Sequence, residues 1–306
     1  MMQRRRFLTI LAGAGTGLAL GTGAGAQTAR WRGVALGARA RIEIDHPESA
    51  RLLAAARAEI ARLEAIFSLY RRDSALVRLN AAGAQDAPAP DLVRLLALAG
   101  RVHRATGGAF DPTIQPLWAL HAAHAVQGTD PEPTALAEAR ARVGFDRVSV
   151  SPARIAFDRA GMALTLNGIA QGYIADRVAE LLAAEGLPGA LVQTGEIRAI
   201  GRRPDGSAWP VGVSDGAGGV AERIALADRA VATSAPRGTV LDTAGRVGHL
   251  FDPATGHPGG AWRTVSVTAD SAAVADGLST AFCLMQRPDI DAALARFPDA
   301  RLAHLA

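Results

Sequence analysis

The stretch Ala163-Leu164-Thr165-Leu166-Asn167-Gly168-Ile169-Ala170-Gln171-Gly172-Tyr173 separates a mainly helical first half of the chain from a mainly β second half. Its apolar run over 163–166 predicts a strand, Asn-Gly predicts a turn, and the pattern that follows predicts a helix to Ala184. Backbone amides at such a turn and at a helix N-terminus point at one spot, which suits an anion. A single glycine turn is weak evidence, so the rest of the chain must decide what binds there.

The sequence before this stretch predicts helices with a few strands. Partial alternation of apolar and polar residues predicts one half-buried strand within Val34–Asp45, and apolar residues at helical spacing predict a long helix over Pro47–Phe67. Ser74 is expected to cap a short helix, 85–90 to form a loop, and Asp91 to cap the next helix. Further helices are predicted after Pro112 and near 134–143, and short strands over 147–150 and 154–157.

The sequence after the stretch predicts a run of short strands separated by Gly, Pro and Asp turns. A helix over Ser271–Leu284 follows them, then a short helix near 290–296 and an edge strand at 301–304. The predicted strands cover 190–194, 195–199, 209–213, 223–226, 231–233, 247–251 and 264–268.

Composition excludes several kinds of chemistry. With 306 residues, 49% hydrophobic and 20% charged, the chain is typical of a folded globular protein. It contains no lysine, which excludes Schiff-base catalysis and the lysine-dependent phosphate-binding loop. Its single cysteine, Cys283, excludes an intrachain disulfide and argues against a cysteine zinc site. Nothing in the charge pattern indicates nucleic-acid binding.

The first 26 residues are predicted to be a signal peptide. Arg4-Arg5-Arg6-Phe7-Leu8 opens the chain, a Gly/Ala-rich apolar run follows, and Ala24-Gly25-Ala26 offers a cleavage site after Ala26. Arg-Arg-x-Phe-Leu is the twin-arginine pattern, so we expect export to the periplasm and a mature chain of 27–306. The alternative, an uncleaved membrane anchor, is disfavoured because glycines interrupt a run that is short for a span.

Gly248-His249-Leu250-Phe251-Asp252-Pro253-Ala254-Thr255-Gly256 combines a histidine, a carboxylate, a proline and a turn glycine. This pattern predicts a strand that leads into a tight turn and places His249 at the strand end, where side chains reach a cleft. Taken alone, a histidine beside a turn is more often structural than catalytic.

Asp276 and Thr280 lie four residues apart on the predicted late helix, so their oxygens share one face. Hard cations such as Mg²⁺ prefer such oxygen ligands. The alternative is a solvated aspartate beside a threonine that bonds back to the helix carbonyl, and on this pair alone that alternative is favoured.

The chain contains seven motifs in a fixed order: F-S-x-Y, T-G-G-A-F-D-P-T, G-I-A-x-G-Y, G-E-I-R-A-x-G, A-T-S, H-x-x-D-P-x-T-G and A-D-x-x-S-T-A. The ordered set is far more specific than any one motif, and it resembles the ApbE family of FAD:protein FMN transferases. The resemblance spans about Val34 to Leu284. Within the family, the chain is similar to the exported NosX branch, which serves nitrous oxide reduction. It implies an α+β fold: a single large domain of two intertwined subdomains with mixed or antiparallel sheets flanked by helices, related to the T-fold.

The resemblance implies a role for twelve residues. His249 matches the catalytic histidine; Asp276, Thr280 and the Gly168 carbonyl match the Mg²⁺ ligands. Where the family reads D-L-G-G-I-A-K-G-Y, this chain has Thr165, Asn167 and Gln171 at the first, third and seventh positions. The positions implied to contact FAD are Leu36, Tyr70, Ala109, Phe110, Asp111, Thr165, Gln171 and Leu250.

The implied reaction is transfer of FMN from FAD to a Thr or Ser hydroxyl of an acceptor protein, with AMP released and Mg²⁺ required. The implied acceptor is a flavoprotein of an electron-transfer system, such as a membrane-bound component of nitrous oxide reduction. Two alternatives stay open: a Mg²⁺-dependent FAD pyrophosphatase, in which water replaces the acceptor, and a periplasmic protein that binds or delivers flavin without cleaving it.

Overall fold

The computed structural model describes residues 28–216 and 218–306. The predicted signal peptide over 1–26 lies outside these ranges.

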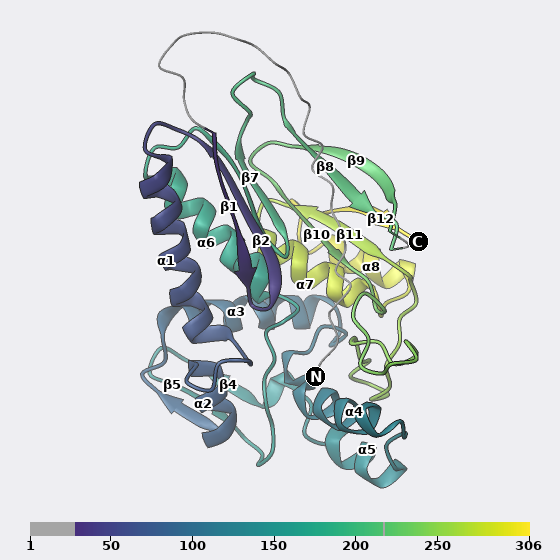
Figure 1. Cartoon of the computed structure of the whole chain (residues 1–306). Helices are drawn as coiled ribbons and strands as arrows, with labels where there is room; N and C mark the ends of the chain where they lie inside the picture. Colours follow the sequence, from purple (N-terminus) through teal and green to yellow (C-terminus); the bar gives the residue numbers. More distant parts are fainter. Residues whose placement is uncertain (1–27, 217) are drawn as a thin grey trace.

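A seven-stranded sheet forms the centre of the fold (Figure 1). All of its neighbouring strands pair antiparallel, as do those of the two smaller sheets, so of the two kinds of sheet expected, mixed or antiparallel, the described residues form the antiparallel kind. The strand order is β1 (Thr28–Ala35), β2 (Ala38–Asp45), β6 (Gly189–Thr194), β7 (Ile197–Gly201), β10 (Ala230–Ser234), β11 (Val265–Ala269) and β12 (Arg301–Leu305).

Three helices cover one face of this sheet: α1 (Ser49–Phe67), α6 (Ala170–Ala184) and α7 (Ala272–Phe282) (Figure 1). Their apolar faces and the facing sheet residues share one large buried core. The hairpin of β8 (Trp209–Ser214) and β9 (Val220–Leu226) covers part of the opposite face through a small apolar cluster that includes Trp209 and Ile197. The sheet is therefore a middle layer with a large core on one side only.

Most of the remaining elements lie around one end of the sheet, whereas α8 lies near α7 (Figure 1). Within the described ranges, no helix is both long and apolar enough to cross a membrane. The remaining helices are α2 (Ala75–Ala82), α3 (Pro90–Ala105), α4 (Gln115–Gln127), α5 (Pro133–Arg140) and α8 (Arg287–Leu294), with the 3₁₀ turns Pro112–Ile114 and Phe145–Arg147. A small sheet consists of β3 (Ala84–Asp86), β5 (Arg154–Phe157) and β4 (Val148–Val150).

Most predicted elements are confirmed within one or two residues, including the Ser74 cap, whose side chain accepts a hydrogen bond from Val77 N. The half-buried strand predicted within Val34–Asp45 is confirmed from Ala38 onward as β2, but the chain turns at Leu36-Gly37, so Val34 and Ala35 belong to β1 of a β1–β2 hairpin. Both turn residues have positive φ, 46° and 79°, as the hairpin turn with two left-handed residues requires. The Leu36 amide donates to Glu64 Oε1 at 2.8 Å, so a helix side chain holds this turn.

Two other predicted strands, 163–166 and 247–251, are irregular. Leu164 exchanges hydrogen bonds with the Asn80 side chain, and Thr165 N donates to the Pro112 carbonyl, so neither joins a ladder. Segment 247–251 forms only isolated bridges at Gly248 and Phe251.

The region around Asp91 also differs from expectation. Asp91 does not cap α3: the cap is Ala89 with Pro90 at the first turn, and the Asp91 carboxylate is buried. Part of the loop predicted at 85–90 belongs to β3, which pairs with β5.

The pairing register brings several turns to one edge of the main sheet. The Leu36-Gly37 turn lies beside the end of β6, because Ala40 pairs with Thr194. The Gly195-Glu196 turn joins β6 to β7 at that edge, and β10 ends there at Ser234, opposite Val265. This edge holds the candidate site.

Candidate active site

A cavity of about 520 Å³ opens at this edge of the sheet. All twelve residues singled out in the sequence line it, although they come from segments spread over more than two hundred positions. The structure therefore brings the whole predicted set together, while the individual roles stay predictions. The twelve are Leu36, Tyr70, Ala109, Phe110, Asp111, Thr165, Gly168, Gln171, His249, Leu250, Asp276 and Thr280.

Close packing of α6 against α7 positions Asp276. A Cβ at position 172 would collide with the Ala272 carbonyl, so Gly172 permits the helices to approach. The Gly172 amide donates to Asp276 Oδ2 at 3.1 Å, and no other hydrogen bond to this carboxylate is found in the described part of the chain. Asp276 is 3% exposed, and burial raises its pKa to about 7. A buried carboxylate with one partner favours a bound cation.

Two further oxygens lie beside this carboxylate. Thr280 is one helical turn beyond Asp276, and its Oγ1 is 3.5 Å from the Gly168 carbonyl. A Cβ at position 168 would lie 3.1 Å from Thr280, so glycine allows this approach. Carboxylate, hydroxyl and carbonyl oxygens form a donor set that fits Mg²⁺. No group of three or more His, Cys, Asp and Glu that could hold a metal ion occurs among the described residues.

Glu196 is a second buried carboxylate on the cavity wall, and the sequence analysis gave it no role. It is 8% exposed and its Oε2 accepts a hydrogen bond from Thr233 N at 3.1 Å. Burial raises its pKa well above the usual value, and the neighbouring charge of Asp276 raises it further. The signal was available, because an acidic residue directly follows Gly195 in the turn between two predicted strands.

His249 lies on an irregular loop rather than at a strand end. Gly248 packs so closely on the Pro236 carbonyl that a Cβ would collide with it, and His249 N donates to the same carbonyl at 3.2 Å. His249 Nδ1 is 3.1 Å from the Thr239 carbonyl. Since a carbonyl only accepts, Nδ1 carries the proton and Nε2 is the acceptor nitrogen of the neutral ring.

The loop that carries His249 is closed behind it by a turn. Asp252 accepts hydrogen bonds from Ala254 N at 2.8 Å and from Thr255 Oγ1 at 3.2 Å, and Gly256 has a φ of 79°. His121, on α4, donates from Nε2 to the Gly256 carbonyl at 2.9 Å and stacks on Phe251. These contacts hold the loop in place.

The predicted flavin positions form the other walls. Leu36 is 4% exposed in its left-handed conformation, whereas Tyr70 is 51% exposed at the opening. Asp111 is buried, and its carboxylate accepts hydrogen bonds from Thr113 N, Thr113 Oγ1 and Phe145 N at 2.8, 2.5 and 3.1 Å. The Asp111 side chain therefore shapes the Phe110 segment rather than presenting an unoccupied carboxylate.

Comparison with known proteins identifies the fold and the family. The sequence pattern of the ApbE family matches residues 36–303. The chain belongs to the ApbE family. The FAD:protein FMN transferase of Treponema pallidum is 33% identical over 276 residues, which is 78% of this chain and 75% of that protein. The FAD:protein FMN transferase of Haemophilus influenzae is 31% identical over 235 residues, or 71% and 68% of the two chains.

Solved ApbE structures share the α+β architecture. The ApbE protein of Thermotoga maritima matches with a TM-score of 0.80 at 28% identity, covering 90% of this chain and 93% of that one. The flavinyl transferase ApbE of Pseudomonas stutzeri, in its apo form, matches with a TM-score of 0.75 at 29% identity, covering 87% of each chain.

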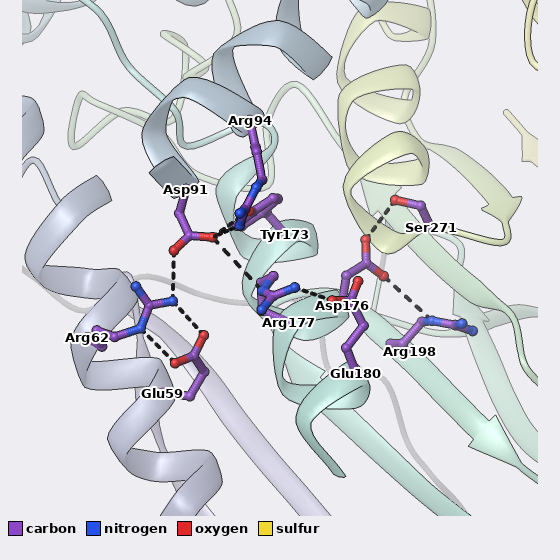
Figure 2. Close-up of polar contacts among 10 residues, drawn as sticks. All are labelled: Glu59, Arg62, Asp91, Arg94, Tyr173, Asp176, Arg177, Glu180, Arg198 and Ser271. Carbon is purple, nitrogen blue, oxygen red and sulfur yellow. Dashed lines mark hydrogen bonds and ion pairs between the residues drawn. The ribbon is translucent and has the colours of Figure 1, made fainter. Parts of the chain in front are cut away.

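In this ApbE chain a second aspartate fixes the helix that carries Asp276 and Thr280. Asp176, on α6, accepts hydrogen bonds from Ser271 Oγ, Ala272 N and Ala273 N at 2.7, 2.8 and 3.0 Å. Figure 2 shows Asp176 between Ser271 and Arg198, whose Nε lies 3.6 Å from Asp176 Oδ1. The carboxylate satisfies amides that α7 leaves without helical partners at its N-terminus.

Proposed function

We propose that this chain transfers FMN from FAD to a Thr or Ser hydroxyl of an acceptor protein and releases AMP. One observation carries the proposal. The same cavity is lined by a histidine whose Nε2 can accept a proton and by a set of oxygens suited to Mg²⁺. The positions matched to flavin contacts line that cavity as well. The names of the relatives and the family match over 36–303 support the same activity.

The proposed reaction is a phosphoryl transfer. The acceptor hydroxyl oxygen forms a bond to the phosphorus on the FMN side of FAD, the bond from that phosphorus to the AMP oxygen breaks, and AMP leaves with the electron pair. Catalysis of such a step depends mainly on positioning and on charge neutralisation. His249 Nε2 takes the hydroxyl proton, while the Thr239 carbonyl holds the ring in the required tautomer.

Asp276, Thr280 and the Gly168 carbonyl would hold Mg²⁺. When bound, the ion supplies positive charge to the diphosphate of FAD. The protein's own contribution is to position these oxygens: Gly172 fixes the Asp276 carboxylate, and Gly168 allows Thr280 to approach its carbonyl.

His249→Ala tests the base. FAD binding should persist, while transfer should fall by about 10²–10⁴-fold, the usual contribution of a general base. His257→Ala is the matched control, because His257 lies exposed on the same loop and outside the cavity lining. FAD affinity is measured by flavin fluorescence, and transfer by acceptor mass together with released AMP. Loss of FAD binding along with activity would make His249 structural instead.

The same assay tests the two alternatives, a FAD pyrophosphatase and a flavin-binding or delivery protein. Thr165 and Gln171 favour these alternatives, because both differ from the family pattern at positions matched to FAD contacts. An FMN adduct on the acceptor supports transfer. AMP without an adduct supports a pyrophosphatase, and FAD binding with neither product supports a delivery protein.

We also propose that residues 1–26 direct twin-arginine export, that the mature unit is 27–306, and that the protein acts in the periplasm. If the chain belongs to the NosX branch, its acceptor is an electron-transfer flavoprotein, such as a membrane-bound component of nitrous oxide reduction. The arginine pair in the leader supports export. Replacing Arg4 and Arg5 together by lysine should retain the protein in the cytoplasm, which fractionation measures; normal export of that variant would exclude the twin-arginine route.

A further inference from the structure

Three arginines of the β1–β2 hairpin, Arg32, Arg39 and Arg41, line the opening of the cavity, and we call them the basic rim. Their positions follow from strand alternation. Ala38, Ala40 and Ile42 point into the core, so Arg39 and Arg41 point to the opposite face of the sheet. Arg32 pairs directly with Arg41 in the antiparallel register, which places it on the same face.

The basic rim is not neutralised within the described part of the chain. Arg41 forms an ion pair with Glu43, but Glu43 also pairs with Arg30 at 3.2 Å. Neither Arg32 nor Arg39 forms an ion pair with any residue of 28–216 or 218–306, and both are exposed. Like charges directly opposite each other on neighbouring strands are unfavourable unless an anion lies between them. This arrangement therefore favours an anionic partner.

The carboxylates of the same cavity lie elsewhere. Glu196 and Asp276, at 8% and 3% exposed, line its buried part, which we call the floor, whereas Arg32 and Arg39 line its exposed part. The cavity thus has an acidic floor and a basic rim. A cation is attracted to the first and an anion to the second.

The charge of FAD is carried by its diphosphate, which the proposed function places at the floor with Asp276, Thr280 and Gly168. The basic rim then faces the second reactant, because the acceptor hydroxyl has to enter through the same opening. Exposed apolar groups stand beside the rim: Val34, opposite Arg39 in the register, is 60% exposed, and Tyr70 is 51% exposed. Arginine and tyrosine beside exposed apolar surface are typical of protein interfaces.

We propose that the basic rim docks an acidic segment of the acceptor protein, next to the hydroxyl that receives FMN. This inference rests on the proposed function for the identity of the partner. The contact itself is a binding event that needs neither FAD nor chemistry.

The test measures binding in the absence of FAD. The probe is a fluorescein-labelled peptide with one Thr flanked by Asp and Glu, and its twin carries Asn and Gln instead. Anisotropy should show that the wild-type chain prefers the acidic peptide and that added salt weakens this preference, since exposed charges are screened. Arg32→Gln/Arg39→Gln should weaken binding of the acidic peptide about five- to tenfold, as expected for two exposed ion pairs, and flatten the salt dependence.

Arg57→Gln is the matched control, because Arg57 is an exposed arginine on α1 with no ion pair among the described residues and lies outside the cavity lining. It should bind both peptides as the wild type does. Arg32→Glu/Arg39→Glu should reverse the preference toward the amide peptide. Melting curves show that each variant is folded.

Three results would overturn the inference. Equal binding of both peptides by the wild type would mean that the rim recognises no acidic segment. A loss of FAD affinity in Arg32→Gln/Arg39→Gln, with peptide binding unchanged, would assign the arginines to FAD. Arginine-dependent binding of phosphatidylserine vesicles without peptide binding would assign them to a membrane surface. If acidic peptide binds as expected but no FMN is transferred to any acceptor, the docking surface stands and the proposed function fails.

Discussion

Asp176 and Asp276 lie on helices that pack against each other, yet their surroundings differ. Asp176 accepts three hydrogen bonds and lies 3.6 Å from Arg198 Nε. Asp276 accepts one hydrogen bond, from Gly172 N. Burial raises the pKa of both carboxyl groups; around Asp176 the amides of Ala273 and Ala272, the Ser271 hydroxyl and Arg198 act against it.

The difference separates a structural carboxylate from one available to a ligand. The partners of Asp176 are the amides at the start of α7, so its charge is used to fix that helix. Asp276 lines the cavity and keeps oxygen lone pairs for something that the protein does not supply. The four predictions below test this contrast, beginning with the largest expected effect.

Asp276→Asn should lower Mg²⁺-dependent AMP release by at least about 100-fold, comparable to the loss of one strong electrostatic group in an active site. Stability without Mg²⁺ should not fall, because the variant removes a buried charge with a single partner. AMP release and urea unfolding with and without Mg²⁺ measure both effects. Asp289→Asn, an exposed carboxylate on α8, is the control. Activity equal to wild type at every Mg²⁺ concentration would remove Asp276 from the metal site.

Asp176→Ala should have the opposite profile, with a loss of about 3 kcal/mol in the free energy of unfolding, since two helix amides and Arg198 lose their partner. Urea unfolding measures this loss. The free energy of unfolding of Asp176→Asn should lie between those of the wild type and Asp176→Ala, because the asparagine side-chain oxygen still accepts hydrogen bonds. A stability equal to wild type would show that α7 is fixed by packing alone.

Asp91 provides the pH dependence. Burial raises its pKa, but hydrogen bonds from Tyr173 and Arg62 outweigh this and hold the pKa below its usual value (Figure 2). A folded-state pKa below the unfolded one stabilises the protein above about pH 4, and this contribution is lost as the pH falls through the folded pKa. Asp91→Asn should therefore cost about 2 kcal/mol at pH 7 and clearly less at pH 3, measured by urea unfolding. A difference independent of pH would mean that the ionised carboxylate is not what matters.

The smallest expected effect is on the alkylation rate of Cys283, which lies at the C-terminal end of α7. Burial raises its thiol pKa to about 12, so alkylation by iodoacetamide at pH 8 should be slow in the folded protein. The rate should increase in Asp176→Ala, where α7 opens more often, and stay at the wild-type value in Asp276→Asn. Equal rates in all three proteins would show that the Asp176 contacts do not restrain this end of the helix.

Local signals in the sequence predicted those elements whose formation depends on neighbouring residues. The apolar spacing of α1 and the Ser74 cap are examples, and both are confirmed. The Leu36-Gly37 turn was missed because a leucine at positive φ is disfavoured locally and depends on Glu64, 28 positions away. The sequence predicts that Asp91 caps a helix because acidic residues commonly start helices, whereas in the structure Arg62 and Tyr173 bind its carboxylate across three helices.

The order of the motifs and the absence of lysine chemistry follow directly from the order and types of residues along the chain, and the resemblance of those motifs to the ApbE family implied the twelve cavity residues. Only the tertiary structure decided which carboxylates are satisfied and which charges face each other. Asp176 and Asp276 cannot be told apart from the sequence, and the contact between α6 and α7 binds the first to amides at the start of α7 and leaves the second with one hydrogen bond on the cavity wall. Likewise, Arg32 and Arg41 become neighbours only through the hairpin register, since like charges nine positions apart have no fixed relation until the strands pair.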